Sequence, residues 1–165
     1  MAQIRLVTAE DLSHLRNCEI QIWESLREWL PDSFVSPDIS FIQGPEYLQR
    51  RQQLLQNKEA ICLLAEEDKD VVGLAIGMAR EDDVGMLNFL GVKKEHRKTG
   101  IGLNLLRSFL EEAKKKKAHK VWLFTSPSLR PAIRLYVNEG FVPEGYMRRH
   151  SHGQDLIIYS KFLDE

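Results

Sequence analysis

The stretch Leu90-Gly-Val-Lys-Lys-Glu-His-Arg-Lys-Thr-Gly-Ile-Gly102 is the most informative part of the 165-residue chain. A buried strand is predicted to end at Val92, and a short basic loop then leads to two glycines that open a helix. Four apolar residues on one face make that helix amphipathic: Leu106, Phe109, Leu110 and Ala113. Glycine lets the backbone approach a ligand closely, and the N–H groups at a helix start favour an anion. With Arg97 and Lys98 adding positive charge, the loop is predicted to hold phosphate, and a pyrophosphate fits it best.

Two common phosphate-binding motifs do not fit this loop. A P-loop continues into Gly-Lys-Ser or Gly-Lys-Thr, and no such tripeptide follows here. The dinucleotide-binding fingerprint requires glycine or alanine where Leu105 stands. It also requires an acidic residue about 20 residues further on, where Ala118 to Lys120 stand. The loop is therefore predicted to be a phosphate site of another class.

Length and composition describe an ordinary globular chain, and one domain covering residues 1–165 is expected. With 43% hydrophobic and 28% charged residues, wholesale disorder is excluded. No apolar run approaches the ~20 residues that a membrane span needs, so no membrane partner is expected. Cys18 and Cys62 are too few for a disulfide framework and are predicted to be buried thiols. Because the N-terminus has no signal-peptide core, a cytoplasmic location is expected.

The hydrophobic pattern on either side of the loop predicts a mixed sheet with helices on its faces, an α/β or α+β domain. Before the loop, the expected elements are a strand 4–7, a helix that begins at a capping box of Thr8 and Asp11 and ends at Pro31, a loop 31–44 containing Pro37, a helix 45–57, and strands 60–65, 71–78 and 86–92. After the loop, they are a helix 100–117, a strand 121–125, a helix 129–138, a strand from Phe141, an acceptor-side loop 142–155 and a strand 156–162.

The loop closely resembles the signature of the GNAT superfamily of N-acetyltransferases. That signature is Arg or Gln, two residues, Gly, one residue, and Gly or Ala, which matches Arg97-Lys98-Thr99-Gly100-Ile101-Gly102. The preceding Leu90-Gly-Val92 is similar to the strand end whose backbone binds the pantetheine arm of acetyl-CoA in that family. The resemblance implies a GNAT-like mixed, mostly antiparallel central sheet with helices on both faces. It also implies that eight residues bind acetyl-CoA: Leu90, Val92, Arg97, Lys98, Thr99, Gly100, Ile101 and Gly102.

A second segment, Ala132-Ile-Arg-Leu-Tyr-Val-Asn-Glu-Gly-Phe141, also resembles the family. By pattern alone, Tyr136 shares a helical face with Leu129 and Ile133 and could be a core aromatic. In the family, a tyrosine at this position sits near the thioester sulfur and can protonate the departing thiolate, which makes Tyr136 the predicted catalytic residue. One departure is Leu129, where the family often has an asparagine that contacts the cofactor.

The implied function is transfer of an acetyl group from acetyl-CoA to a primary amine by direct attack in a ternary complex. Two alternatives stay open: a non-catalytic acyl-CoA-binding or sensing module of the same fold, and a nucleic-acid binder that uses the basic stretch 93–120. The leading hypothesis expects no nucleic-acid partner and leaves a homodimer open. The acceptor amine is not identified, although Trp23, Trp29 and Phe34 could line its pocket.

A general base for the amine is not identified either. Five residues are candidates, and none is preferred: Glu24, Glu28, Glu81, His150 and His152. The spacing of the two histidines would place both on one strand face, but no third ligand is evident, so no metal site is predicted.

The net charge of −1 hides an uneven distribution. From Lys93 to Lys120 there are ten Lys+Arg and three acids, whereas the other residues hold 13 Lys+Arg and 21 acids. This division predicts a basic side that holds the CoA phosphates and an acidic remainder that faces a cationic amine.

Overall fold

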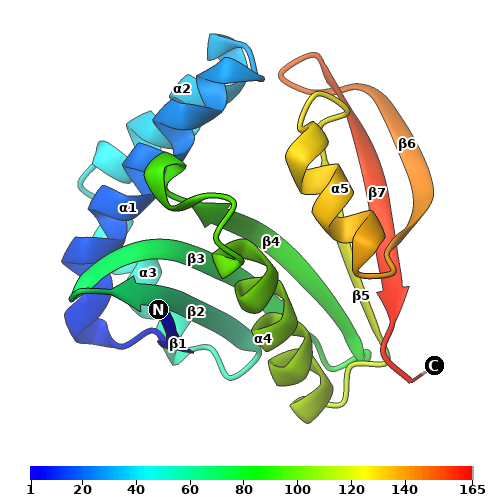
Figure 1. Cartoon of the computed structure of the whole chain (residues 1–165), viewed down its shortest axis with the longest axis horizontal. Coiled ribbons are helices and arrows are strands. Elements are labelled where there is room, and N and C mark those ends of the chain that lie inside the picture. Colours follow the sequence, from blue (N-terminus) through cyan, green and yellow to red (C-terminus); the bar gives the residue numbers. More distant parts are fainter. Residues whose placement is uncertain (165) are drawn as a thin grey trace.

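The computed structural model describes residues 1–164 of the chain. Its centre is a seven-stranded sheet in the order β1-β2-β3-β4-β5-β7-β6 (Figure 1). The strands are β1 (Gln3–Leu6), β2 (Ala60–Glu67), β3 (Asp70–Ala79), β4 (Val84–Val92), β5 (Lys120–Thr125), β6 (Val142–Ser151) and β7 (Gln154–Phe162). All neighbouring strands pair antiparallel except β4 and β5, which are parallel. The predicted mixed, mostly antiparallel sheet is therefore confirmed.

Helices cover both faces of the sheet, as predicted (Figure 1). They are α1 (Leu12–Ser25), α2 (Asp32–Gln43), α3 (Tyr47–Gln56), α4 (Ile101–Lys115) and α5 (Arg130–Asn138), with short 3-10 turns η1 (Ala9–Asp11), η2 (Leu26–Glu28) and η3 (Lys94–His96). The helices α4 and α5 lie on one face, and α1 to α3 lie on the other. None of the helices among residues 1–164 is long and apolar enough to cross a membrane.

The main core lies between the sheet and α4. The Phe109 ring on α4 is fully buried and packs against the backbone of Gly77, where a Cβ would collide with the ring and with the Met86 carbonyl. A second core lies under α1, where Ile22 packs so closely on Gly91 of β4 that an added Cβ would also clash. These two contacts fix β3 and β4 between α1 and α4.

The sheet opens in a V between β4 and β5. These strands pair only from Val84↔Lys120 to Met86↔Trp122. On the other edge of β4, the register shifts because Asn88 is an extra residue between the pairs Gly77↔Leu87 and Ile76↔Phe89. Such a β-bulge bends a strand, so β4 turns away from β5 beyond this point. Figure 1 shows the two strands diverging toward the end where the loop before α4 lies.

The segment 31–44 was predicted to be a loop, and this prediction was wrong. It contains the helix α2, with Pro37 inside it. A proline in a helix interior removes one hydrogen bond and destabilises the helix by ~3 kcal/mol. Burial of Val35, Ile39 and Ile42, which share one helical face, offsets this loss.

The prediction of an acceptor-side loop over residues 142–155 was also wrong, because most of this segment belongs to the hairpin of β6 and β7. Other predicted elements agree with the structure to within a few residues. The capping box of Thr8 and Asp11 is confirmed, and so is the burial of Cys18 and Cys62 as free thiols.

Candidate active site

A cavity of about 520 Å³ fills the V between β4 and β5. One wall comes from α1, η2 and α2, and the opposite wall comes from β5 and α5. The predicted aromatic residues Trp23, Trp29 and Phe34 all line it. So do Leu90 and Val92 at the end of β4. The divergence of the two strands therefore creates the space, and side chains from both faces of the sheet enclose it.

The N-terminus of α4 forms one end of this cavity. Gly100 precedes the helix with φ +87°, in the left-handed region that favours glycine, and a Cβ built on it would have no atom within 4 Å. The first turn of α4 carries no acidic residue, and no side chain of residues 1–164 caps it. The first N–H groups of a helix have no intrahelical partner. This end of the cavity therefore offers unpaired donors and open space to an anion.

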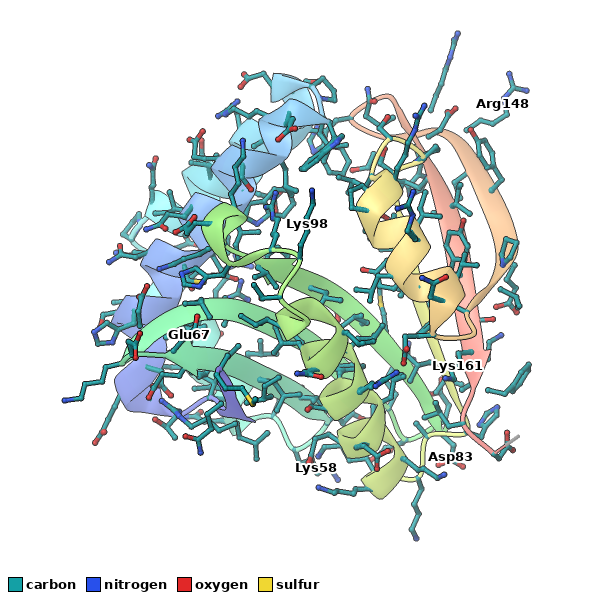
Figure 2. All side chains as sticks on the ribbon, in the orientation of Figure 1. Lys58, Glu67, Asp83, Lys98, Arg148 and Lys161 are labelled. Atoms are coloured by element: carbon teal, nitrogen blue, oxygen red, sulfur yellow. The ribbon has the colours of Figure 1, made fainter. Side chains whose placement is uncertain are left out.

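The two cations of the loop have different surroundings. Arg97 points inward: its Nε donates to the Val92 carbonyl at 3.0 Å, its Nη2 donates to the Ser25 hydroxyl, and its guanidinium lies 5.5 Å from the centre of the Trp29 ring. Burial lowers the pKa of Arg97. Lys98 is exposed and lines the open end of the V (Figure 2). Arg97 therefore anchors the loop to α1, while Lys98 is placed to meet a ligand.

Two further loop residues have side chains outside the cavity. The Thr99 hydroxyl donates to the His96 carbonyl at 2.6 Å, and Ile101 is buried in the main core. Their backbone N–H groups alone can serve the site. Gly102 lines the cavity, and its backbone has room because a Cβ there would reach Val92 and Leu135 only at ordinary contact distance.

The end of β4 turns backbone groups into the cavity. Residues of an antiparallel strand direct their N–H and C=O groups alternately toward one neighbour and the other. The Lys93 N–H donates to the Val72 carbonyl at 2.9 Å, so Lys93 and Gly91 face β3. Leu90 and Val92 therefore face the other side, where β5 has moved away. The Leu90 backbone groups and the Val92 N–H are available to an amide-containing ligand, while the Val92 carbonyl accepts a hydrogen bond from Arg97 Nε.

Tyr136 enters the cavity from α5. Its side chain is 6% exposed, and its ring lies 5.8 Å from the Phe141 ring, so it is also part of the core. Among residues 1–164, no hydrogen bond to its hydroxyl is found. Burial raises the pKa of the phenol above its usual value, which keeps it protonated at neutral pH. Tyr136 is thus both a residue of the core and a residue of the cavity lining.

Leu129, the departure from the family pattern, is the residue before α5. It lines the cavity and packs against the apolar cluster of Leu30, Val35 and Ile39, which belongs to the opposite wall. Leu129 therefore makes an apolar contact across the V at the position where the family often has a polar residue.

The five candidate bases lie outside the cavity lining. Glu24 pairs with Arg27 at 2.8 Å and Glu28 pairs with Lys94 at 3.4 Å on the surface. Glu81 belongs to the same turn as Asp83, which Figure 2 places at the closed end of the V. His150 is exposed on β6. His152 approaches the site, because its ring lies edge-on to Phe34 with centres 6.1 Å apart.

The predicted basic side is not one surface. Lys93 is buried and pairs with Asp70 at 2.7 Å, and Lys94 pairs with Glu28. The run 114–117 lies at the far end of α4, ~20 Å from Gly100 at the rise of an α-helix. No aspartate or glutamate lines the cavity in the part of the chain that the structure describes. The charge division of the sequence therefore does not correspond to two sides of the site.

Sequence reasoning missed Asn88, Phe124 and Leu156, which also line the cavity. Asn88 could have been noticed as a polar residue inside the apolar strand 86–92. No local pattern marks the other two, because their role depends on β5 and β7 facing α1 across the V.

Comparison with known proteins identifies the family of this chain. Residues 23–141 match the acetyltransferase (GNAT) family. The chain belongs to this family. N-alpha-acetyltransferase 60 of Drosophila melanogaster is 27% identical over 126 residues, 66% of this chain and 46% of the relative, so the GNAT chain spans about half the length of that curated relative.

Solved GNAT structures share the whole fold. The PaiA N-acetyltransferase of Thermoplasma acidophilum, solved in complex with coenzyme A, has a TM-score of 0.83 and 21% identity, with 98% of this chain and 99% of that chain covered. The ribosomal-protein-alanine N-acetyltransferase of Brucella melitensis has a TM-score of 0.76 and 25% identity over the same shares of the two chains.

Proposed function

We propose that residues 1–165 form one cytoplasmic N-acetyltransferase domain, which transfers an acetyl group from acetyl-CoA to a primary amine in a ternary complex. The observation that carries the proposal is the cavity between β4 and β5, with the bare N-terminus of α4 at one end and Tyr136 in its lining.

The chemistry of the cavity fits acetyl-CoA. The N–H groups after Gly100, together with the Lys98 ammonium, suit a pyrophosphate. The Leu90 backbone groups and the Val92 N–H suit the amides of a pantetheine arm, which would pair with them as a neighbouring strand does. The apolar walls suit its methylene groups. The solved PaiA enzyme with coenzyme A supports the same ligand class.

Transfer by direct attack requires three events. The nitrogen of a neutral amine attacks the acetyl carbonyl carbon, the carbon–sulfur bond breaks, and the sulfur leaves as a thiolate. The amine loses one proton and the thiolate gains one. Fixing both substrates in one cavity supplies much of the rate by proximity. Backbone N–H groups at the end of β4 would stabilise negative charge on the carbonyl oxygen.

Tyr136 is the proposed proton donor to the thiolate. The phenol is protonated at neutral pH, and its hydroxyl has no competing partner within residues 1–164. A donor must lie within hydrogen-bond reach of the departing atom, and the place of Tyr136 in the cavity lining supports this role for a thioester bound in the V.

The names of the relatives make a protein α-amine the first acceptor to test. The decisive assay is release of free thiol from acetyl-CoA with peptides of different first residues, small amines, polyamines and aminoglycosides. The proposal expects amine-dependent thiol release. A protein that binds no acetyl-CoA and releases no thiol with any amine would contradict it.

The second candidate is a non-catalytic acyl-CoA-binding module, which the lack of a carboxylate in the described cavity lining favours. The same assay separates the two functions. Calorimetric binding of acetyl-CoA without turnover over the whole panel supports the binding module, and turnover with any amine rejects it.

A further inference from the structure

We propose that the acceptor is a primary amine attached to an apolar group of aromatic size, and that the side-chain amide of Asn88 orients its nitrogen. This inference rests on the proposed acetyltransferase function and names the substrate class of the same cavity.

The cavity has two chemically different sides. On the α4–α5 side, the lining includes the loop residues Lys98 and Gly100 and the phenol of Tyr136. The side formed by α1, α2 and the opposite face of the sheet is where a second substrate can approach the reacting carbon. The two sides meet where β4 and β5 separate, beyond Met86.

The second side is apolar and rich in aromatic rings. Trp23 and Phe89 stack with ring centres 5.8 Å apart and an interplanar angle of 28°. Phe124 of β5 also lines the cavity and is 40% exposed. Phe34 of α2 and Leu156 of β7 complete this wall. An apolar group bound here would gain contact with several rings while leaving water.

The same side gives no partner to a second positive charge. None of the described lining residues is acidic, and the nearby carboxylates of Glu24 and Glu28 are already paired with Arg27 and Lys94. Asp38 lies one helical turn beyond Phe34, outside the lining, and burial raises its pKa. A charge in an apolar cavity without a partner is strongly unfavourable. Polyamines and aminoglycosides, which carry several ammonium groups, therefore fit poorly.

Asn88 is the polar side chain that the bulge of β4 brings to this wall. In the described chain its Nδ2 donates to one acceptor, the Met86 sulfur at 3.4 Å, and sulfur is a weak acceptor. Among residues 1–164 its Oδ1 has no hydrogen-bond donor. An amide oxygen can accept one N–H of a neutral amine and leave the nitrogen lone pair directed at the carbonyl carbon. Asn88 is therefore a positioning residue rather than a base.

The acceptor class is tested with the wild-type enzyme and a matched panel of amines. The panel contains phenethylamine, short peptides that begin with Phe, Leu, Gly or Ser, spermidine and kanamycin. We expect kcat/KM for phenethylamine or the Phe and Leu peptides to exceed that for spermidine and kanamycin by at least about tenfold. The small amine and the peptides distinguish a free amine from a polypeptide end as the source of the same chemistry.

The possible failures are distinguishable. A preference for spermidine or kanamycin, or for the Gly and Ser peptides over the apolar ones, overturns this inference and leaves the acetyltransferase function intact. No thiol release with any amine overturns the proposed function and this inference with it.

The role of Asn88 is tested by substitution. Asn88→Ala should raise KM for the best amine roughly tenfold, the effect of one lost hydrogen bond, with KM for acetyl-CoA unchanged. Asn88→Asp places a carboxylate beside the amine and should move the acidic limb of the kcat/KM profile to lower pH. The control is Asn138→Ala, because Asn138 is an exposed asparagine on α5 outside the lining. This variant should leave both KM values and the pH profile unchanged. Equal changes in both KM values, or an unmoved pH profile in Asn88→Asp, would overturn the role.

Discussion

Tyr136 lines a largely apolar cavity, and its hydroxyl has no hydrogen-bond partner within residues 1–164. Tyr136→Phe removes that hydroxyl and keeps the ring that packs against Phe141. If the phenol protonates the thiolate, kcat should fall about 10²-fold, the lower end for general acid catalysis. The calorimetric Kd for acetyl-CoA should change less than twofold, roughly, because no ground-state contact is lost. Steady-state kinetics and calorimetry measure the two quantities.

The control for this substitution is Tyr159→Phe. Tyr159 of β7 is equally buried, 6% exposed, but it does not line the cavity. The Tyr159→Phe variant should retain the wild-type kcat. Equal losses in both variants, or an unchanged kcat in Tyr136→Phe, would remove Tyr136 from the mechanism.

A substitution of Gly100 tests whether the loop before α4 binds CoA. Gly100→Ala adds a Cβ that has no atom of residues 1–164 within 4 Å but would occupy the open space before α4, so affinity for CoA should fall at least about tenfold. The left-handed backbone also destabilises a non-glycine residue by ~1 kcal/mol. Gly140→Ala, at φ +86° and away from the cavity, carries the same strain and should keep the wild-type affinity. Similar Kd values for both variants, measured by calorimetry, would show that the space before α4 is not used.

At the scale of an element, the start of the first helical segment depends on Asp11. Its carboxylate accepts two hydrogen bonds from Arg5, both at 2.8 Å, and one from the Thr8 N–H at 2.8 Å. The Arg5 hydrogen bonds hold the pKa of Asp11 well below its usual value. Asp11→Asn should therefore destabilise the fold by about 1–3 kcal/mol at pH 7.

The sign of the pH dependence follows from that lowered pKa. The contribution of Asp11 is complete above the unfolded-state pKa of ~3.9 and is lost as the pH falls toward the lower folded-state value. The difference between wild type and Asp11→Asn in urea unfolding should therefore shrink steadily below about pH 4. A difference that stays constant down to pH 2 would assign the stabilisation to something other than the charged carboxylate.

Some elements could be predicted from the sequence because their signals are local. The glycines of the 97–102 loop, the capping box at Thr8 and the alternating strands carry their own patterns. The helix α2 was missed because Pro37 outweighed the face formed by Val35, Ile39 and Ile42. A proline is a local signal, whereas the burial that overcomes it is tertiary.

The candidate site likewise contains residues that local sequence predicts and residues that depend on tertiary contacts. The loop before α4 and Tyr136 are found within short segments, so sequence alone could name them. The inward turn of Arg97 depends on Ser25 and Trp29, which are distant in sequence. The bulge at Asn88 depends on the register between β3 and β4, which no single-strand pattern specifies. The aromatic wall needs α1, α2, β5 and β7 together.

At the scale of the whole molecule, the cavity joins two halves of the sheet that pair at only three positions between β4 and β5. A ligand in the V contacts both halves and should stabilise the folded state. At a CoA concentration of 100 times Kd, the expected gain is about 2.7 kcal/mol. A chain of this size should then melt roughly 5–10 °C higher. Calorimetric melting curves with and without CoA measure this shift, and an unchanged melting temperature at that concentration would contradict binding to the folded state.

Amide hydrogen exchange with and without CoA tests binding in the V most directly, because it locates the ligand on the chain. Binding in the V predicts slower exchange in the loop and first turn of α4 (97–104), at the end of β4 (88–92) and along α5, with the run 114–117 unchanged. Protection confined to other segments, or protection of 114–117 without the loop at 97–104, would show that CoA does not bind in the V.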